Sequence, residues 1–266
     1  MIESLNSPHI ARVKALTSSR GAKERKNARQ FVAEGLQCAK EALSARNNNP
    51  DFQAPSVETL FLTVNGRSKI EQNQDLAIPS SLNVIDVSDE VMRQMSETIT
   101  PQGILAICSI SENDISSIKL NGKRRFIYLS EVQDPGNAGT ILRSADAFGM
   151  DAVITSPGSV DMFSPKVVRS TAGSLWHIPV FEGVELFEIL KLNLQAVSLG
   201  ADGSRSLIDY QPSGDVLAIF GNEARGLSEL DSISGVELVK IPMPGNAESL
   251  NLSAAATIVM YHLSIA

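Results

Sequence analysis

Hydrophobic positions in the first 110 residues alternate between helical spacing and short apolar runs. Ile10, Val13 and Leu16 follow the pair Ser7-Pro8 at helical spacing, which predicts a helix. Further helices are expected at 36–45 and 89–97, and strands at 31–35, 57–64, 83–88 and 103–110. Strands that alternate with helices indicate a small α/β domain over residues 1–110.

The rest of the chain follows a different pattern. Residues 111–125 are polar and lack a clear period, which is typical of a linker. Strands are then predicted at 126–130, 152–155, 177–180, 195–199, 216–220 and 237–241, and helices at 139–149, 184–192 and 248–264. The strands are apolar without alternation, as in a parallel sheet covered on both faces, so residues 126–266 are predicted to form a second α/β domain.

Composition narrows the class of protein. The chain has 266 residues, of which 43% are hydrophobic, and no apolar run reaches membrane-spanning length. Cys38 and Cys108 lie in separate regions, and His9, His177 and His262 are scattered, so neither a disulfide framework nor a metal site is expected. Because the N-terminus also lacks the apolar stretch of a signal peptide, a soluble cytoplasmic protein is predicted.

Charge is distributed unevenly along the chain, whose net charge is −7. Residues 1–46 carry a net charge of +5, and the remaining residues carry a net charge of −12. The basic residues cluster in one stretch, which we call the basic stretch: Arg20, Lys23, Arg25, Lys26 and Arg29. Such a cluster is suited to contact RNA phosphates, and from charge alone a solvated basic face is an equal alternative.

The first candidate for chemistry is the segment EVQDPGNAGTILR, from Glu131 to Arg143. A strand ends here, a Pro-Gly turn follows, and a helix is predicted from about Gly139. Asn137 would precede this helix and Arg143 would lie one turn into it, near backbone N–H groups that favour an anion. An ordinary helix start with a surface pair between Arg143 and Asp146 is the alternative.

Two further polar segments follow predicted strands. FGNEARGLS, residues 220–228, matches neither the P-loop nor the glycine fingerprint of dinucleotide-binding proteins. IPMPGNAESLN, residues 241–251, combines a proline-stiffened loop with a helix start capped by Glu248 or Ser249. Each segment alone says little, whereas the order and spacing of the three together form a specific pattern.

That pattern resembles the three motifs of the SpoU, or TrmH-like, family of RNA ribose methyltransferases, over roughly residues 126–266. In the N-terminal half, RQFVAEGLQCAKEAL and VSDEVMRQMSETITPQGILAIC are similar to the family's substrate-binding domain, which has an L30-like fold. The resemblance implies an α/β fold with a C-terminal SPOUT-type parallel sheet and a trefoil knot, preceded by the smaller L30-like domain. It also implies a homodimer with S-adenosylmethionine as cofactor.

The family motifs also imply which residues form the site. The implied catalytic residues are Asn137, Arg143, Glu223, Ser249 and Asn251. The residues implied to hold S-adenosylmethionine are Leu199, Gly221, Asn222, Ile241, Met243 and Leu250. In the family, the counterpart of Arg143 is held to activate the ribose hydroxyl. Because a guanidinium stays protonated, we expect Arg143 to grip the adjacent phosphate and to stabilise the developing alkoxide.

The expected substrate is structured RNA, recruited by the N-terminal domain and the basic stretch. Family members with such a domain mostly modify large-subunit ribosomal RNA, so this target is predicted, with tRNA as the alternative. A non-catalytic RNA-binding assembly factor is the competing class, and the intact motif residues disfavour it. A Rossmann-type enzyme is disfavoured because the glycine fingerprint is absent.

Overall fold

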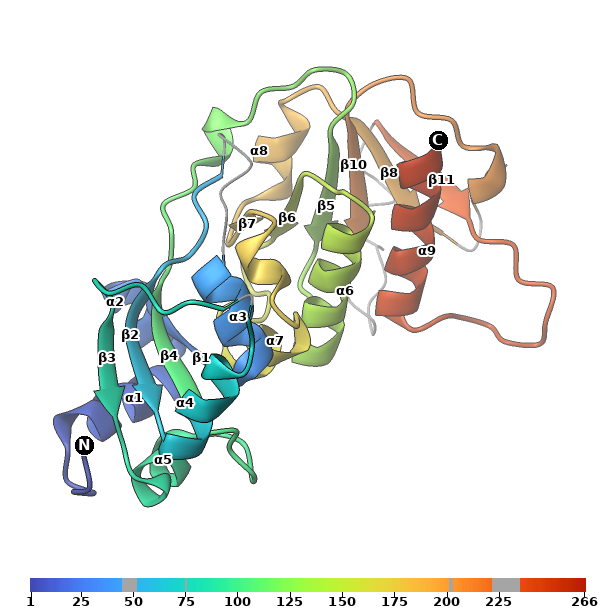
Figure 1. Ribbon diagram of the computed structural model, residues 1–266. Helices are drawn as coiled ribbons and strands as arrows, with labels where there is room; N and C mark the ends of the chain where they lie inside the picture. Colours follow the sequence, from blue (N-terminus) through green and yellow to red (C-terminus); the bar gives the residue numbers. More distant parts are fainter. Residues whose placement is uncertain (45–51, 75, 201–202, 222–234) are drawn as a thin grey trace. The chain divides into compact units, whose positions relative to one another are not determined.

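The computed structural model describes residues 1–44, 52–74, 76–200, 203–221 and 235–266. The chain forms two compact units (Figure 1). The first comprises Met1–Glu112 and Asp161–His177, and the second comprises Asn113–Val160 and Ile178–Ala266. The first unit therefore takes in a segment from the part of the chain that the sequence assigns to the second domain. Among the described helices, none is both long and apolar enough to span a membrane.

The first unit is built on a sheet with the strand order β1-β4-β2-β3. β4 is antiparallel to β1 and β2, whereas β2 and β3 are parallel. The strands are β1 (Gln30–Glu34), β2 (Val57–Leu62), β3 (Asn83–Asp86) and β4 (Ile104–Ser109). The helices are α1 (Pro8–Thr17), α2 (Ala22–Ala28), α3 (Leu36–Ser44), α4 (Val64–Glu71), α5 (Asp89–Met95) and α7 (Pro165–Ser170).

Apolar side chains cover both faces of this sheet. On one face, the buried side chains of α1 and α5 pack against Val32, Phe61 and Leu105. Phe31 points to the opposite face, because neighbouring residues of a strand alternate. Its ring lies 5.2 Å from the ring of Phe163 and 5.8 Å from that of Trp176. These two aromatic residues hold the segment 161–177 against β1.

The second unit has a sheet whose described strands are all parallel, in the order β7-β6-β5-β10-β8-β11-β9. They are β5 (Arg125–Leu129), β6 (Ala152–Thr155), β7 (Val180–Phe181), β8 (Gln195–Leu199), β9 (Arg205–Ser206), β10 (Val216–Phe220) and β11 (Val236–Lys240). The helices are α6 (Pro135–Ala147), α8 (Leu186–Leu190) and α9 (Leu252–Ile265), with 3-10 turns at Ile115–Ser117 and Leu207–Asp209. The predicted parallel sheet is confirmed.

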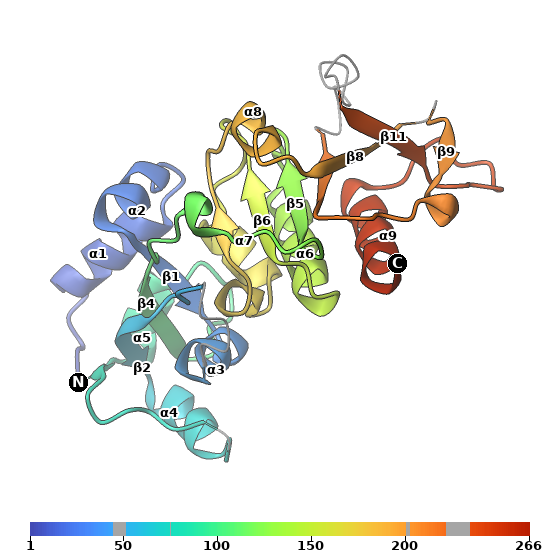
Figure 2. The same ribbon diagram turned by 90° about the horizontal axis from the view of Figure 1, so that it is seen from above.

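Helices cover this sheet on both faces, as the continuous apolar strands predict. Phe126, Tyr128, Leu217 and Ile219 pack with Ile189 of α8 on one face. α6 and α9 lie together on the other face (Figures 1 and 2).

Some predicted boundaries are wrong, and each error has a local cause. α6 begins at Pro135 rather than near 139, because Asp134 caps it. α9 begins at Leu252 rather than 248, because Asn251 is the capping residue and not Glu248 or Ser249. The strand predicted at 57–64 ends at Leu62, where Thr63 caps α4. The strand predicted at 177–180 is β7 at Val180–Phe181. The short elements α2, α4, α7 and β9 lack a clear apolar period and were not predicted.

Candidate cofactor and active site

The carboxyl ends of four neighbouring parallel strands meet at one edge of the second unit's sheet. In spatial order these strands are β5, β10, β8 and β11. The three polar segments follow β5, β10 and β11, so the topology brings the first residues of each segment to the same edge; of the second segment, the structure describes Phe220 and Gly221. Ligands in open parallel sheets bind at this edge, because loops there surround a crevice outside the strand ends.

The first polar segment is held by the start of α6. The Asp134 side chain accepts a hydrogen bond from the backbone N–H of Asn137 at 2.7 Å, and Pro135 occupies the first turn. Asn137 therefore lies inside the helix and is buried, whereas the sequence placed it in the preceding loop. A capping aspartate followed by proline is a known helix start signal and could have located this boundary.

The third segment is joined to the first by a hydrogen bond between side chains. Asn251 caps α9, and its Oδ1 accepts from the backbone N–H groups of Ser253 at 2.9 Å and Ala254 at 3.4 Å. Its Nδ2 donates to Oδ1 of Asn137 at 3.2 Å. Two predicted site residues that are far apart in the sequence are thus brought together. Further along the same helices, the hydroxyls of Ser144 and Thr257 lie 2.8 Å apart.

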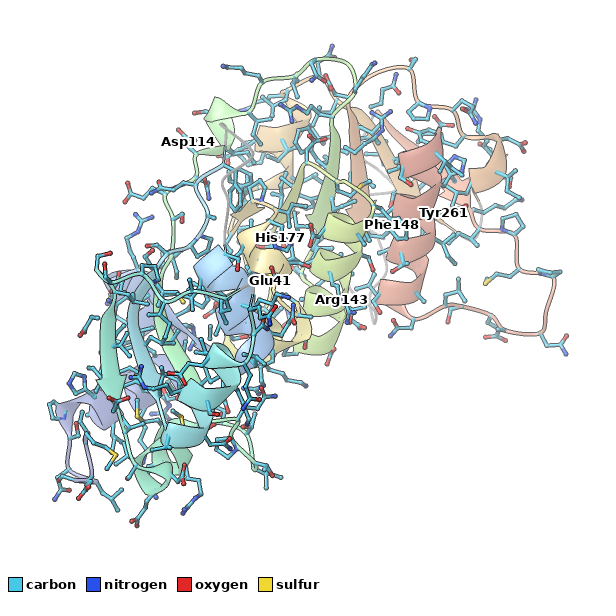
Figure 3. All side chains as sticks on the ribbon, viewed as in Figure 1. Glu41, Asp114, Arg143, Phe148, His177 and Tyr261 are labelled. Atoms are coloured by element: carbon cyan, nitrogen blue, oxygen red, sulfur yellow. The ribbon has the colours of Figure 1, made fainter. Side chains whose placement is uncertain are left out.

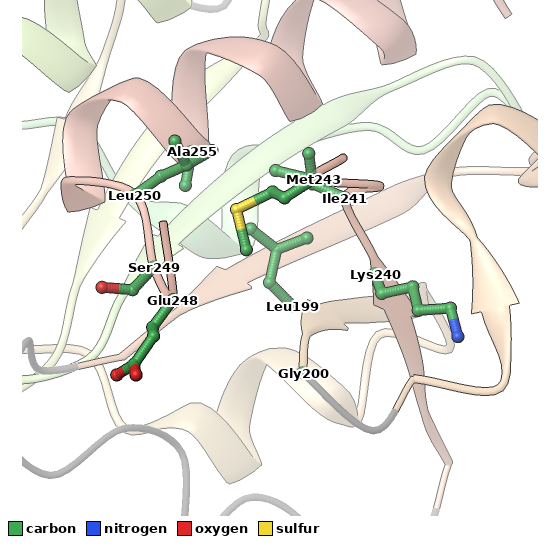
Figure 4. Close-up of a pocket in the computed structure, with 9 residues that line it drawn as sticks. All are labelled: Leu199, Gly200, Lys240, Ile241, Met243, Glu248, Ser249, Leu250 and Ala255. Carbon is green, nitrogen blue, oxygen red and sulfur yellow. The ribbon is translucent and has the colours of Figure 1, made fainter. Parts of the chain in front are cut away.

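A cavity of about 330 Å³ lies beside the ends of β8 and β11 (Figure 4). Five predicted site residues line it: Leu199, Ile241, Met243, Ser249 and Leu250. The sequence analysis missed four other lining residues: Gly200, Lys240, Glu248 and Ala255. Gly200 and Lys240 lie at the carboxyl ends of predicted parallel strands, where ligands bind, so their position could have marked them as site residues. Lys240 and Glu248 lie on opposite sides of the cavity in Figure 4.

The cavity fits the cofactor that the motifs imply. Its volume falls within the range of about 300–1,000 Å³ that small-molecule sites occupy. Its wall combines aliphatic side chains with a polar loop, which suits an adenosine group that carries no phosphate. The absence of a glycine-rich phosphate loop in the sequence is consistent with such a ligand.

Arg143 lies on the exposed surface of α6 (Figure 3). It follows Asn137 by six residues, a rotation of about 240° in an α-helix, so the two side chains leave α6 on different sides. That Asn137 and Arg143 act at one site stays a prediction.

Asn222 and Glu223 lie outside the described residues. Gly221 is described and directly follows β10, at the edge where the other segments meet.

The five cations of the basic stretch lie in different environments within the first unit. Arg25 is 4% exposed and bound to Asp161, with Nε–Oδ2 and Nη2–Oδ2 distances of 2.8 and 2.7 Å. The prediction that Arg25 contacts RNA is therefore wrong for this conformation, because its guanidinium is committed inside the unit. Arg29 pairs with Glu112. Arg20, Lys23 and Lys26 are exposed.

The two cysteines are structural. Both are buried as free thiols. Burial raises the pKa of Cys38 to about 11 and raises that of Cys108 still further, so neither supplies a thiolate at neutral pH. Among the residues that the structure describes, no group of three His, Cys, Asp or Glu side chains is placed to hold a metal ion.

Comparison with known proteins assigns the chain to a family. The model of the SpoU rRNA methylase family matches residues 124–261. This chain belongs to the SpoU rRNA methylase family. A model of the MRM3-like substrate-binding domain matches residues 10–106 of this SpoU protein.

Similar proteins cover nearly the whole of this SpoU chain. The 23S rRNA (guanosine(2553)-2′-O)-methyltransferase RlmP of Bacillus subtilis is 33% identical over 91% of each chain. An AdoMet-bound rRNA methyltransferase from Sinorhizobium meliloti is 29% identical, with a TM-score of 0.82 over 98% of this chain and 96% of that one. The SpoU methyltransferase AviRb from Streptomyces viridochromogenes, 23% identical, shares the fold with a TM-score of 0.80 over 97% of both chains. The trefoil knot stays a prediction.

Proposed function

We propose that this protein transfers a methyl group from S-adenosylmethionine to a ribose 2′-hydroxyl of ribosomal RNA. The observation that carries the proposal is the cavity at the ends of β8 and β11, which is lined by residues of the third SpoU motif. It lies in a chain that resembles a named 23S rRNA 2′-O-methyltransferase over 91% of its length. The large-subunit RNA is the favoured target for the same reason.

The bound cofactor supplies an electrophilic methyl group on a positively charged sulfur. The chain has to hold the ribose oxygen in line with this methyl group and to help the oxygen lose its proton. The hydrogen-bonded pair of Asn137 and Asn251 fixes the start of α6 against the start of α9, whose residue Ala255 lines the cavity. Ser249, on the cavity wall, supplies a polar group that can orient the ribose.

Arg143 has the role of stabilising the alkoxide that forms as the proton leaves. Its guanidinium is a poor base, but its planar fork can bind a phosphate with two hydrogen bonds and place positive charge near the oxygen. We expect Arg143→Lys, which keeps the charge and loses the fork, to lower the turnover rate by about 100-fold, as the loss of one transition-state donor does. Turnover close to that of the wild type would refute the bidentate grip.

A homodimer is part of the same proposal. Ile258, Tyr261 and Ile265 of α9 are 39%, 54% and 67% exposed and lie at spacings of three and four residues, on one face of the helix. The Tyr261 ring packs edge-on against Phe148, the residue that directly follows α6, at 5.7 Å, so this face adjoins the helix that carries Arg143 (Figure 3). A second copy covering this face would bring Arg143 to a site between subunits. Light scattering should give the mass of a dimer, and Tyr261→Asp should give a monomer.

The function is tested by mapping ribose methylation in cells with and without the gene. We expect one 2′-O-methyl site to disappear from the large-subunit ribosomal RNA. A site lost from tRNA would support the alternative substrate, and an unchanged map of all RNAs would refute the proposal. Calorimetric titration should show binding of S-adenosylmethionine and no binding of ATP or NAD. The same cells serve to test the predicted cytoplasmic location by fractionation.

A further inference from the structure

Two branched apolar side chains of the first unit are left in solvent at one end of its sheet. Ile99 is 101% exposed and Val64 is 82% exposed. Ile99 belongs to the loop 96–102 between α5 and β4, and Val64 opens α4 directly after β2. Leu62 at the end of β2 pairs in register with Ile104 at the start of β4, so both segments lie at the same end of the sheet.

The loop 96–102 is held in place by a buried carboxylate. The Glu34 side chain at the end of β1 is 7% exposed. It accepts hydrogen bonds from the hydroxyl groups of Ser96 and Thr98, and from the backbone N–H of Glu97 at 3.2 Å. A buried carboxylate is stable only when such donors surround it, so these bonds fix the first half of the loop.

The second half of the loop is fixed through Gln102. Its side-chain Oε1 accepts from the backbone N–H of Leu36 at 2.9 Å, and its carbonyl accepts from Nζ of Lys69 at 2.9 Å. Ile99 therefore stands at the tip of a loop that is anchored on both sides. A side chain presented in this way loses little conformational entropy when it binds a partner.

One cation at the loop is not paired with an acid in the part of the chain that the structure describes. Lys69 donates to the Gln102 carbonyl, and no ion pair of Lys69 with a carboxylate occurs among the described residues. Arg169, a third of whose side chain is exposed, is paired with the Glu34 carboxylate at 4.0 Å and so offsets the charge of that buried acid. The loop contains one acid besides the buried Glu34 that anchors it, the exposed Glu97. An apolar tip on a loop that also binds the Lys69 cation matches a nucleotide, which has an apolar base face and a phosphate.

We propose that the loop 96–102 is an RNA-binding element, in which Ile99 packs on an unpaired base and Lys69 contacts a neighbouring phosphate. The inference rests on the proposed function in that the partner is RNA, and it adds a contact that reads RNA structure. The base faces of a duplex are covered by stacking, whereas an unpaired base offers its face to a side chain. The basic stretch contacts phosphates, so the two elements have different tasks.

The direct test places a photoreactive benzoylphenylalanine at position 99 of the full chain. Large-subunit ribosomal RNA from cells that lack the gene is the probe. We expect irradiation to cross-link position 99 to a nucleotide in a loop or bulge of this RNA. A cross-link from position 5, where Leu5 is 43% exposed in the same unit, should not form. Cross-linking of position 99 to protein alone, or to no RNA, would overturn the proposal.

Binding measurements give an independent result. We expect Ile99→Ala to weaken binding of the same RNA about fivefold, the factor that corresponds to partial burial of one aliphatic side chain. Leu5→Ala is the matched control and should bind as the wild type does. Unchanged RNA affinity of Ile99→Ala would contradict the inference. Titration of the wild-type protein with S-adenosylmethionine separates this inference from the proposed function. If the protein binds RNA through position 99 but does not bind the cofactor, the proposed methyl transfer is refuted and the RNA contact is retained.

Glu34 acts on RNA only by positioning the loop, and a double-mutant cycle separates this role from a general loss of structure. Glu34→Ala should weaken RNA binding as much as Ile99→Ala, and the double variant should be no weaker than either single variant. Glu34→Gln, which keeps a hydrogen-bond acceptor, should restore most of the affinity. Additive effects of the two substitutions would show that Glu34 does not work through Ile99.

Discussion

Arg25 offers a sharp test of how the structure reassigns a charged residue. The sequence groups it with RNA-binding cations, and the structure buries it against Asp161. Its Nη1 also donates to the carbonyl of Leu16. The substitution Asp161→Ala would leave the guanidinium buried without its counter-charge, and Arg25→Met would keep most of the apolar stem while removing the charge.

The expected magnitude follows from burial. Breaking a buried ion pair by removing one partner costs about 3–5 kcal/mol. The Asp161 side chain is 21% exposed, so some water reaches the pair and we take the lower end, about 3 kcal/mol. For a unit of this size that lowers the melting temperature by about 6–12 °C. Arg25→Met leaves the carboxylate near solvent, so we expect a smaller loss than for Asp161→Ala.

The assay combines thermal unfolding of the full chain, followed by circular dichroism, with RNA binding at two salt concentrations. Lys26→Ala, an exposed residue of the same helix, is the matched control. We expect Lys26→Ala to melt as the wild type does and to reduce the salt dependence of RNA binding by about one unit of slope. Arg25→Met should keep that slope. If Arg25→Met instead melts with the wild type and loses RNA affinity, the structural assignment of Arg25 is wrong.

Further predictions concern the α6 cap, a close backbone contact and a buried thiol. Asp134→Ala removes the carboxylate that accepts from the backbone N–H of Asn137 at 2.7 Å. We expect the unfolding free energy to fall by about 1 kcal/mol and methyl transfer to slow. Asp134→Ser, which can still cap the helix, should keep most of the stability and most of the methyl-transfer rate. Gly66→Ala would place Cβ 1.9 Å from the carbonyl oxygen of Gly103, so its urea midpoint should fall well below that of the wild type. Cys38, with a pKa of about 11, should resist iodoacetamide at pH 8 until the protein unfolds. Between pH 9 and 11 the unfolded thiol ionises first, so the unfolding free energy should fall as the pH rises; a flat profile there would contradict the burial of this thiol.

Much of the fold could be read from local sequence. Apolar spacing after Ser7-Pro8 locates α1, and continuous apolar runs locate β5, β6, β8 and β10 almost to the residue. These features depend on side-chain period and backbone preference within a few residues. The family was also available from the sequence, because motif residues such as Asn137 and Arg143 keep their order whatever the packing.

The composition of the site depended on contacts that no local pattern contains. The hydrogen bond between Asn137 and Asn251 joins residues 114 positions apart. It forms only because α6 and α9 lie on the same face of the sheet. Lys240 and Glu248 line the cavity at the ends of β8 and β11. The pairing of these two strands in the sheet is a tertiary contact that the sequence pattern does not contain.

Burial determined which charged residues are paired inside the protein and which face solvent. Arg25 and Lys26 are adjacent in the sequence and equally basic, yet one is bound inside the first unit and the other is exposed. The difference comes from Asp161, which binds Arg25 although it lies 136 positions further along the chain. The sequence determined which residues carry charge, a property of each side chain alone. Only the tertiary structure decided which charges face solvent, because desolvation and pairing depend on the elements that pack around them.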